Sequence, residues 1–251
     1  MNKRLFVLIA GMVMAIVAPL SWAAGGQGPA LAPAPVDVSD RLSLQRGVRL
    51  FANYCLSCHA ADYMRYNRVA RDLGLTDEQV LDNLVFTDAK VGDTMTVAMP
   101  MDQASRWFGK APPDLSVIAR ARGADWLYAY LRGFYLDPSR PMGVNNLYFK
   151  DVGMPHVLWE LQGWQAAKFE NVEDEHGHVT RVFKGFELVE PGSMTPKEYD
   201  RAVRDLTNYL VYMGEPGQLE RAALGPWVLL FLVIFTALAY ALKKEFWRDV
   251  H

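Results

Sequence analysis

The sequence predicts a mainly α-helical domain with long loop insertions and one small β-hairpin, followed by one C-terminal transmembrane helix. Three observations predict this class. Apolar residues recur at helical spacing behind capping residues in several segments, only residues 167–188 alternate as strands do, and residues 222–242 form an uncharged stretch of 21 residues. At 251 residues, the chain is long enough for one domain with a sizeable core.

The N-terminal segment has the layout of a secretory signal peptide. A basic head, residues 1–4, precedes an uncharged run from Leu5 to Ala24, with small residues before Ala24. The alternative is an N-terminal membrane anchor, which the small-residue exit and the glycine-rich residues 25–28 disfavour. We therefore expect residues 1–23 to be removed, and the mature chain to face an oxidising compartment, the periplasm in a bacterium.

The C-terminal stretch has the length and flanking residues of a membrane span. At about 1.5 Å per residue, residues 222–242 would reach roughly 30 Å, the thickness of a bilayer core. Lys243 and Lys244 follow it, and positive residues stay on the cytoplasmic side. A buried core helix of this length would usually carry a polar face. The predicted divisions are a signal peptide (1–23), a periplasmic domain (24–221), a transmembrane anchor (222–242) and a cytoplasmic tail (243–251).

The charge balance excludes a strongly basic surface. The chain has 26 basic and 28 acidic residues, a formal charge of −2. No basic patch indicates nucleic acid, and a mildly acidic periplasmic face suits a basic protein partner. Acidic residues gather in the predicted hairpin, which makes this region a candidate docking surface: Glu170, Glu173, Asp174 and Glu175.

Helical spacing and capping residues place the helices in order. A first helix begins near Ser43 and presents Leu44, Val48, Phe51 and Cys55 on one face. A second helix begins behind a capping box at Thr76. A third runs over residues 124–131 and ends at Gly133, and a last one runs from Thr195 to about Met213 behind a second capping box. The predicted hairpin places Gly177 in its turn.

The chain's only two cysteines stand in the motif Cys55-Leu56-Ser57-Cys58-His59, the C-x-x-C-H attachment signature of a c-type haem. Two thiols on one turn form thioethers with the haem vinyl groups, and the adjacent histidine is the axial ligand. The alternatives are a zinc site, which needs about four ligands, a thioredoxin-like motif, which needs a βαβ pattern, and a structural disulfide. The motif occurs once, so we expect one covalently attached haem c.

The second axial ligand of the iron is less clear from the residues. A methionine thioether is usual in an electron carrier. Met99 and Met154 are each followed by proline in loop-like sequence, and the pattern alone leaves both open. His156 is a rival that would give bis-histidine ligation.

The haem propionates need a cation if they are buried. A guanidinium binds a carboxylate through two hydrogen bonds. Arg120 and Arg122 follow a Pro-Pro turn two residues apart, and the residues alone do not choose between them.

These motifs together resemble the cytochrome c1 family over nearly the whole mature chain. The landmarks are Arg46-Gly47 ahead of the C-x-x-C-H motif, Ala111 to Ser116 with Arg120-Ala121-Arg122, Asn145-Asn146 leading to Gly153-Met154-Pro155, and a capped helix followed by one anchor. The resemblance implies a cytochrome c-like haem domain in which His59 and Met154 ligate the iron and Arg122 binds a propionate.

The resemblance also implies a function and partners. Members of this family pass electrons from a Rieske iron–sulfur protein to a periplasmic cytochrome c within a complex that contains cytochrome b, in the inner membrane of bacteria. Such a subunit has no catalytic site of its own. The alternatives are a free-standing tethered cytochrome that serves an oxidase, and a periplasmic thiol–disulfide oxidoreductase that uses Cys55 and Cys58.

Overall fold

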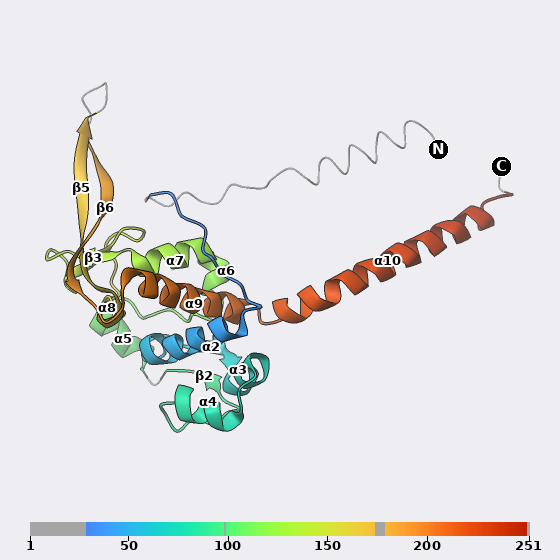
Figure 1. Ribbon diagram of the computed structural model, residues 1–251. Coiled ribbons are helices and arrows are strands. Elements are labelled where there is room, and N and C mark those ends of the chain that lie inside the picture. The colour runs from blue at the N-terminus through green and yellow to red at the C-terminus, as the bar shows by residue number, and fades with distance from the viewer. Residues whose placement is uncertain (1–28, 98, 174–178, 250–251) are drawn as a thin grey trace.

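The computed structural model describes residues 29–97, 99–173 and 179–249. The predicted signal peptide and the predicted turn glycine, Gly177, lie outside these residues. The mainly helical class is confirmed, and the described residues form three small antiparallel sheets besides the helices (Figure 1). In chain order the elements are α2 (Arg41–Leu50), η1 (Phe51–Cys55), β1 (Ala61–Arg65), α3 (Tyr66–Leu73), α4 (Asp77–Leu84), β2 (Thr94–Met95), α5 (Met101–Phe108), α6 (Ile118–Arg122), α7 (Ala124–Arg132), β3 (Phe134–Leu136), β4 (Val144–Asn146), α8 (Trp159–Gln162), β5 (Gly163–Glu173), β6 (Val179–Pro191), α9 (Pro196–Gly214) and α10 (Gln218–Phe246).

Helix α9 is the centre of the domain. It contacts α2 on one side and α6, α7 and α8 on others (Figure 1). Its buried face carries Val203, Leu206, Tyr209 and Leu210, which join the apolar face of α2 in one core. Since α2 leads directly into the C-x-x-C-H motif, the packing of α2 on α9 determines where that motif lies.

A glycine allows α2 and α9 to approach closely. A Cβ atom at Gly47 would lie 2.1 Å from the backbone carbonyl oxygen of Asp205 and 2.7 Å from Cβ of Tyr209. No side chain fits at those distances, so only glycine permits this crossing.

A buried carboxylate joins the same two helices. Asp205 accepts hydrogen bonds from Nε of Arg46 at 2.5 Å, from Oγ of Ser43 at 2.7 Å and from Nη2 of Arg204 at 2.7 Å. Burial raises the pKa of Asp205, but these hydrogen bonds outweigh burial and hold the pKa below its usual value. The carboxylate therefore stays ionised and ties α2 to α9.

The helix boundaries with a local signal are as predicted. Thr76 and Thr195 cap α4 and α9 in complete capping boxes, and Gly133 ends α7. The first helix begins at Arg41 and changes to a π-helical turn at Phe51, which the spacing did not predict. Helices α3, α5, α6 and α8 were not predicted either. Helix α4 buries Val80 and Leu84 and leaves Leu81 38% exposed.

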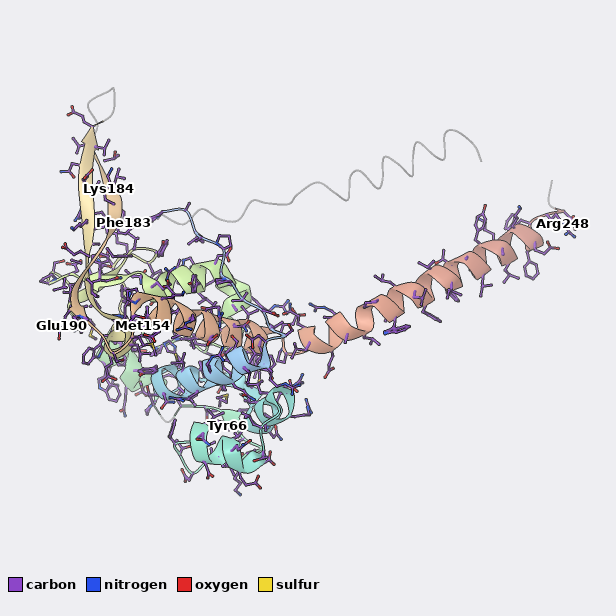
Figure 2. The ribbon with its side chains drawn as sticks, viewed as in Figure 1. Tyr66, Met154, Phe183, Lys184, Glu190 and Arg248 are labelled. Carbon is purple, nitrogen blue, oxygen red and sulfur yellow. The ribbon has the colours of Figure 1, made fainter. Side chains whose placement is uncertain are left out.

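The hairpin and the C-terminal helix are both longer than predicted. Strands β5 and β6 pair from Gly163 opposite Pro191 to Glu173 opposite Val179. Helix α10 contains the whole predicted span, and residues 218–221 and 243–246 extend it. Its mean hydropathy of 2.3 over 18 residues and its 29 residues suffice to cross a membrane by length and composition. It projects away from the domain, with Arg248 just beyond its far end (Figure 2).

We predict that Gly47→Ala destabilises the domain. The added methyl group would force α2 and α9 apart, and overpacking of this kind costs about 1–3 kcal/mol. Thermal unfolding of the haem-loaded protein in detergent, followed by circular dichroism, should show a melting temperature several degrees lower. Gly92→Ala is the matched control, because nothing lies within 4 Å of a Cβ atom at Gly92. Equal melting temperatures for the two variants would contradict the close crossing.

We also predict a pH-dependent effect of Asp205→Asn. Because the folded-state pKa of Asp205 is depressed, its stabilisation is present above about pH 4, the ordinary aspartate pKa, and is lost as the pH falls through the folded value. The variant should unfold at a lower temperature than the wild type from pH 7 to pH 5, by about 1–3 kcal/mol in free energy. The difference should shrink below about pH 4. A difference that stays constant down to pH 3 would rule out this ionised carboxylate as the source.

Candidate haem-binding site

An apolar cavity of about 320 Å³ lies beside α9, between α7, the C-x-x-C-H motif and the loop around Met154. It is lined by all five residues predicted for the site: Cys55, Cys58, His59, Arg122 and Met154. Much of the remaining wall is apolar, from Phe108, Pro112, Leu127, Leu131, Leu206 and Leu210. Residues that are far apart in the sequence therefore meet around one space.

The π-helical turn η1 delivers the first thiol to this cavity. Cys55 is its last residue, and the backbone N–H groups of Cys58 and His59 both donate to the Cys55 carbonyl, at 3.0 and 2.8 Å. Both thiols are free, with Cys55 buried and Cys58 partly exposed. Burial raises the pKa of the Cys55 thiol to about 12.

The backbone orients the histidine of the motif. Nδ1 of His59 lies 2.7 Å from the carbonyl oxygen of Pro113. A carbonyl can only accept, so Nδ1 carries the hydrogen and Nε2 keeps its lone pair free for a metal. Burial lowers the pKa of His59, although the Pro113 carbonyl partly opposes this. The neutral imidazole is the form that binds iron.

The segment after the Pro-Pro turn fixes the chain behind His59. The carboxylate of Asp114 accepts from the backbone N–H of Asp62 and from that of Ser116, both at 2.8 Å. The N–H of Leu115 donates to the carbonyl of Ala60 at 2.8 Å. These bonds explain physically why this segment belongs with the motif: it holds the imidazole in place.

Of the two methionines that the sequence left open, Met154 lines the cavity and Met99 does not. Met154 lies in the body of the domain rather than along the hairpin (Figure 2). The hydroxyl of Tyr130 donates to its sulfur at 3.3 Å. Burial raises the pKa of Tyr130, so the hydroxyl stays protonated and remains a donor. His156, the rival ligand, is buried outside the cavity wall, where it stacks on Phe134 at 5.0 Å.

The two arginines lie in different surroundings. The guanidinium of Arg122 is on the cavity wall, 4.9 Å from the ring centre of Trp126 and 5.7 Å from that of Phe149. Arg120 instead lies 4.0 Å from the carboxylate of Glu215. Arg122 is therefore the arginine that faces this space.

The sequence reasoning missed Tyr130 and the carbonyl of Pro113. Tyr130 stands four residues after Trp126, and the two rings stack at 4.8 Å on the cavity side of α7. Helical spacing could have placed both on one face, but nothing local showed that this face meets Met154. The Pro113 carbonyl could not be found from the sequence, because every residue has a backbone carbonyl and its residue type does not show which group it contacts.

The residues around the cavity fit a covalently bound haem. Two thiols, one imidazole with a free Nε2, one thioether and one guanidinium meet in a mostly apolar space. This donor set and a C-terminal helix able to span a membrane define a membrane-anchored c-type cytochrome as the class of protein.

Comparisons with known proteins agree with this class. A model of the Cytochrome C1 family matches residues 33–250. Cytochrome c1 of Allochromatium vinosum is 52% identical, covering 94% of this chain and 96% of that protein. A Nitrosomonas europaea protein named ammonia monooxygenase gamma subunit is 50% identical, covering 94% and 95%. Mitochondrial cytochrome c1 of Saccharomyces cerevisiae is 26% identical, covering 86% and 70%.

The chain belongs to the cytochrome c1 family. It carries covalently bound haem c, as the C-x-x-C-H motif predicts.

We predict that Met154→Leu removes the thioether ligand. The weak sulfur-to-iron band of the oxidised protein should disappear, and the midpoint potential should fall by on the order of 100 mV, because a thioether favours reduced iron. Optical spectra and a redox titration measure both effects. Met99→Leu is the control and should change neither. The assignment is wrong if Met99→Leu removes the band and Met154→Leu keeps it.

Proposed function

We propose that this chain is the membrane-anchored haem subunit of a quinol–cytochrome c oxidoreductase. It takes electrons from a Rieske iron–sulfur protein, assembles with cytochrome b and passes the electrons to a periplasmic cytochrome c. The observation that carries the proposal is that Cys55, Cys58, His59, Arg122 and Met154 line one and the same cavity in a chain of the cytochrome c1 family. Bound haem supplies an iron that gains and loses one electron.

The chain's residues would bind and orient the group. Cys55 and Cys58 would form the thioethers, and His59, held by Pro113, would bind the iron through Nε2. Met154, whose sulfur accepts a hydrogen bond from the Tyr130 hydroxyl, would supply the second ligand of the iron. Donation from the Tyr130 hydroxyl withdraws electron density from the sulfur, which favours the reduced iron.

Two further features would set the polarity of the site. Arg122 would pair with a propionate, since it is the arginine on the cavity wall. Leucines from α7 and α9 exclude water, which strengthens the electrostatic interactions inside. Both features are consistent with electron exchange rather than with bond chemistry on a substrate.

The membrane arrangement is part of the proposal. We infer that residues 1–23 are a signal peptide, that residues 24–221 lie in the periplasm of a bacterial cell and that α10 anchors them. Lys243 and Lys244, near the end of α10, support a cytoplasmic tail of residues 243–251.

The thiol–disulfide alternative is disfavoured by the environment of Cys55. A reactive cysteine needs a lowered pKa and exposure, whereas burial raises the pKa of Cys55 to about 12. A thiol–disulfide oxidoreductase would also have no use for the free Nε2 of His59 or for the Met154 sulfur that Tyr130 contacts.

Two other functions are also disfavoured. A free-standing tethered cytochrome would not require similarity to the cytochrome c1 family across residues 33–250. The Nitrosomonas europaea relative is named as a monooxygenase subunit. We do not propose a monooxygenase role for this chain, because the residues that line its cavity are those of a c-type haem site.

We predict that the chain, affinity-tagged at its C-terminus and purified from its own membranes in mild detergent, brings a cytochrome b and a Rieske protein with it. Adding quinol should reduce the haem c within the complex, and an inhibitor of quinol oxidation should block this. His59→Ala should abolish the reduction because the proximal ligand is lost. Purification of the chain without these partners, with an intact c-type spectrum, would favour the free-standing carrier.

A further inference from the structure

A second hollow lies at the foot of the hairpin, outside the haem-binding cavity. We call it the tryptophan groove, and its wall includes Trp159, Glu160, Trp164, Glu190 and Ser193. Glu190 marks its place at the foot of the hairpin (Figure 2). None of these residues lines the haem-binding cavity.

Two glycines give the groove its fixed floor. A Cβ atom at Gly163 would lie 2.1 Å from the carbonyl oxygen of Glu190, and one at Gly192 would lie 2.4 Å from the nitrogen of Gly163. Gly163 also has a φ angle of 85°, which residues other than glycine rarely adopt. The backbone segments therefore pack directly against each other, and the floor of the groove consists of closely packed backbone.

The aromatic wall has the shape that a planar cation needs. Trp159 and Trp164 stack with their ring centres 5.5 Å apart and their planes 11° apart. Trp159 is 44% exposed, so part of the pair remains open to solvent. A guanidinium is planar, weakly hydrated and stacks face to face on indole, whereas an ammonium is compact and strongly hydrated.

Two carboxylates stand beside this aromatic wall. Glu160 and Glu190 both border the groove. Two other carboxylates of the hairpin already form ion pairs, since Glu170 pairs with Lys184 at 3.1 Å and Glu187 with Lys168 at 3.0 Å. Within the described part of the chain, no such ion pair involves Glu160 or Glu190. The groove thus combines an open indole face with negative charge.

The groove is connected to the Met154 loop through a chain of aromatic contacts, one edge-to-face and one stacked. Trp164 lies 6.0 Å from the ring of His156, which in turn stacks on Phe134 at 5.0 Å. Met154 packs against the small core that contains Phe134. A group held in the groove is therefore next to the loop that carries the cavity methionine.

We propose that the tryptophan groove binds the guanidinium of an arginine side chain presented by a protein partner. The guanidinium stacks on the open face of the Trp159–Trp164 pair, and its N–H groups donate to Glu160 and Glu190. This site is separate from the haem-binding residues and does not depend on the electron-transfer function proposed above.

The test uses the full haem-loaded chain in non-ionic detergent, labelled with 5-fluorotryptophan. Fluorine NMR gives one signal for each labelled tryptophan, and Trp159→Leu and Trp164→Leu identify the two signals of the groove by their loss. A capped hexa-arginine peptide added at low salt should shift both signals saturably. An equal concentration of hexa-lysine should shift them much less.

Charge variants separate the groove from general attraction. Glu160→Gln/Glu190→Gln should raise the apparent Kd for hexa-arginine about fivefold, the effect of two exposed ion pairs. Glu170→Gln/Glu187→Gln makes the same charge change on the same hairpin and should leave the Kd unchanged. An unaltered haem spectrum shows that each variant is folded.

Three outcomes would overturn the proposal. They are the absence of any shift at the Trp159 and Trp164 signals, equal weakening in both charge variants, and equal shifts with hexa-lysine. A response to tetramethylammonium as strong as that to hexa-arginine would instead assign the groove to a quaternary ammonium, such as a lipid headgroup.

Discussion

The close crossing of α2 and α9 is the constraint on which the rest of the structure depends. Gly47 lets the two backbones touch, and the ionised Asp205 holds them together through Arg46 and Ser43. Helix α2 leads through η1 into the motif, while Leu206 and Leu210 of α9 form part of the cavity wall. The thiols and the apolar wall thus keep their relative positions because of one helix contact.

A second layer of restraint acts on single groups within the cavity. Backbone atoms orient His59, and a phenol orients Met154, so neither donor depends on its own rotamer preference. Fixed geometry of this kind suits electron transfer, in which little should move when the charge on the iron changes. The same arrangement explains why a proline-rich segment far along the chain stands against the motif.

The sequence predicted those features whose causes are local. Residues close together in the sequence determine the capping boxes at Thr76 and Thr195 and the end of α7 at Gly133, and the structure confirms all three. Helices α3 and α5 lack a side-chain cap, and the short strands of the first sheet pair across residues 61–95. Such pairing depends on contacts that no local pattern reveals.

The candidate site divides in the same way. Cys55, Cys58 and His59 were predicted from one motif, because the C-x-x-C-H spacing by itself indicates covalent haem attachment. The choice of Met154 over Met99, and of Arg122 over Arg120, depended on resemblance, since only the folded chain shows which of each pair reaches the cavity. Tyr130 was missed because its partner atom lies 24 residues away.

The π-helical turn before the motif has a consequence for how this segment tolerates change. An α-helix rotates by about 100° per residue, so the direction of Cys55 is set by the number of residues between Gly47 and the motif. The wider turn at Phe51–Cys55 adjusts that direction, leaving Cys55 both in the core and on the cavity wall. Side-chain substitutions in this turn leave the rotation intact, whereas an insertion or deletion turns both thiols and the imidazole away together. The number of residues between the helix crossing and the motif therefore fixes the direction in which the thiols and the imidazole point.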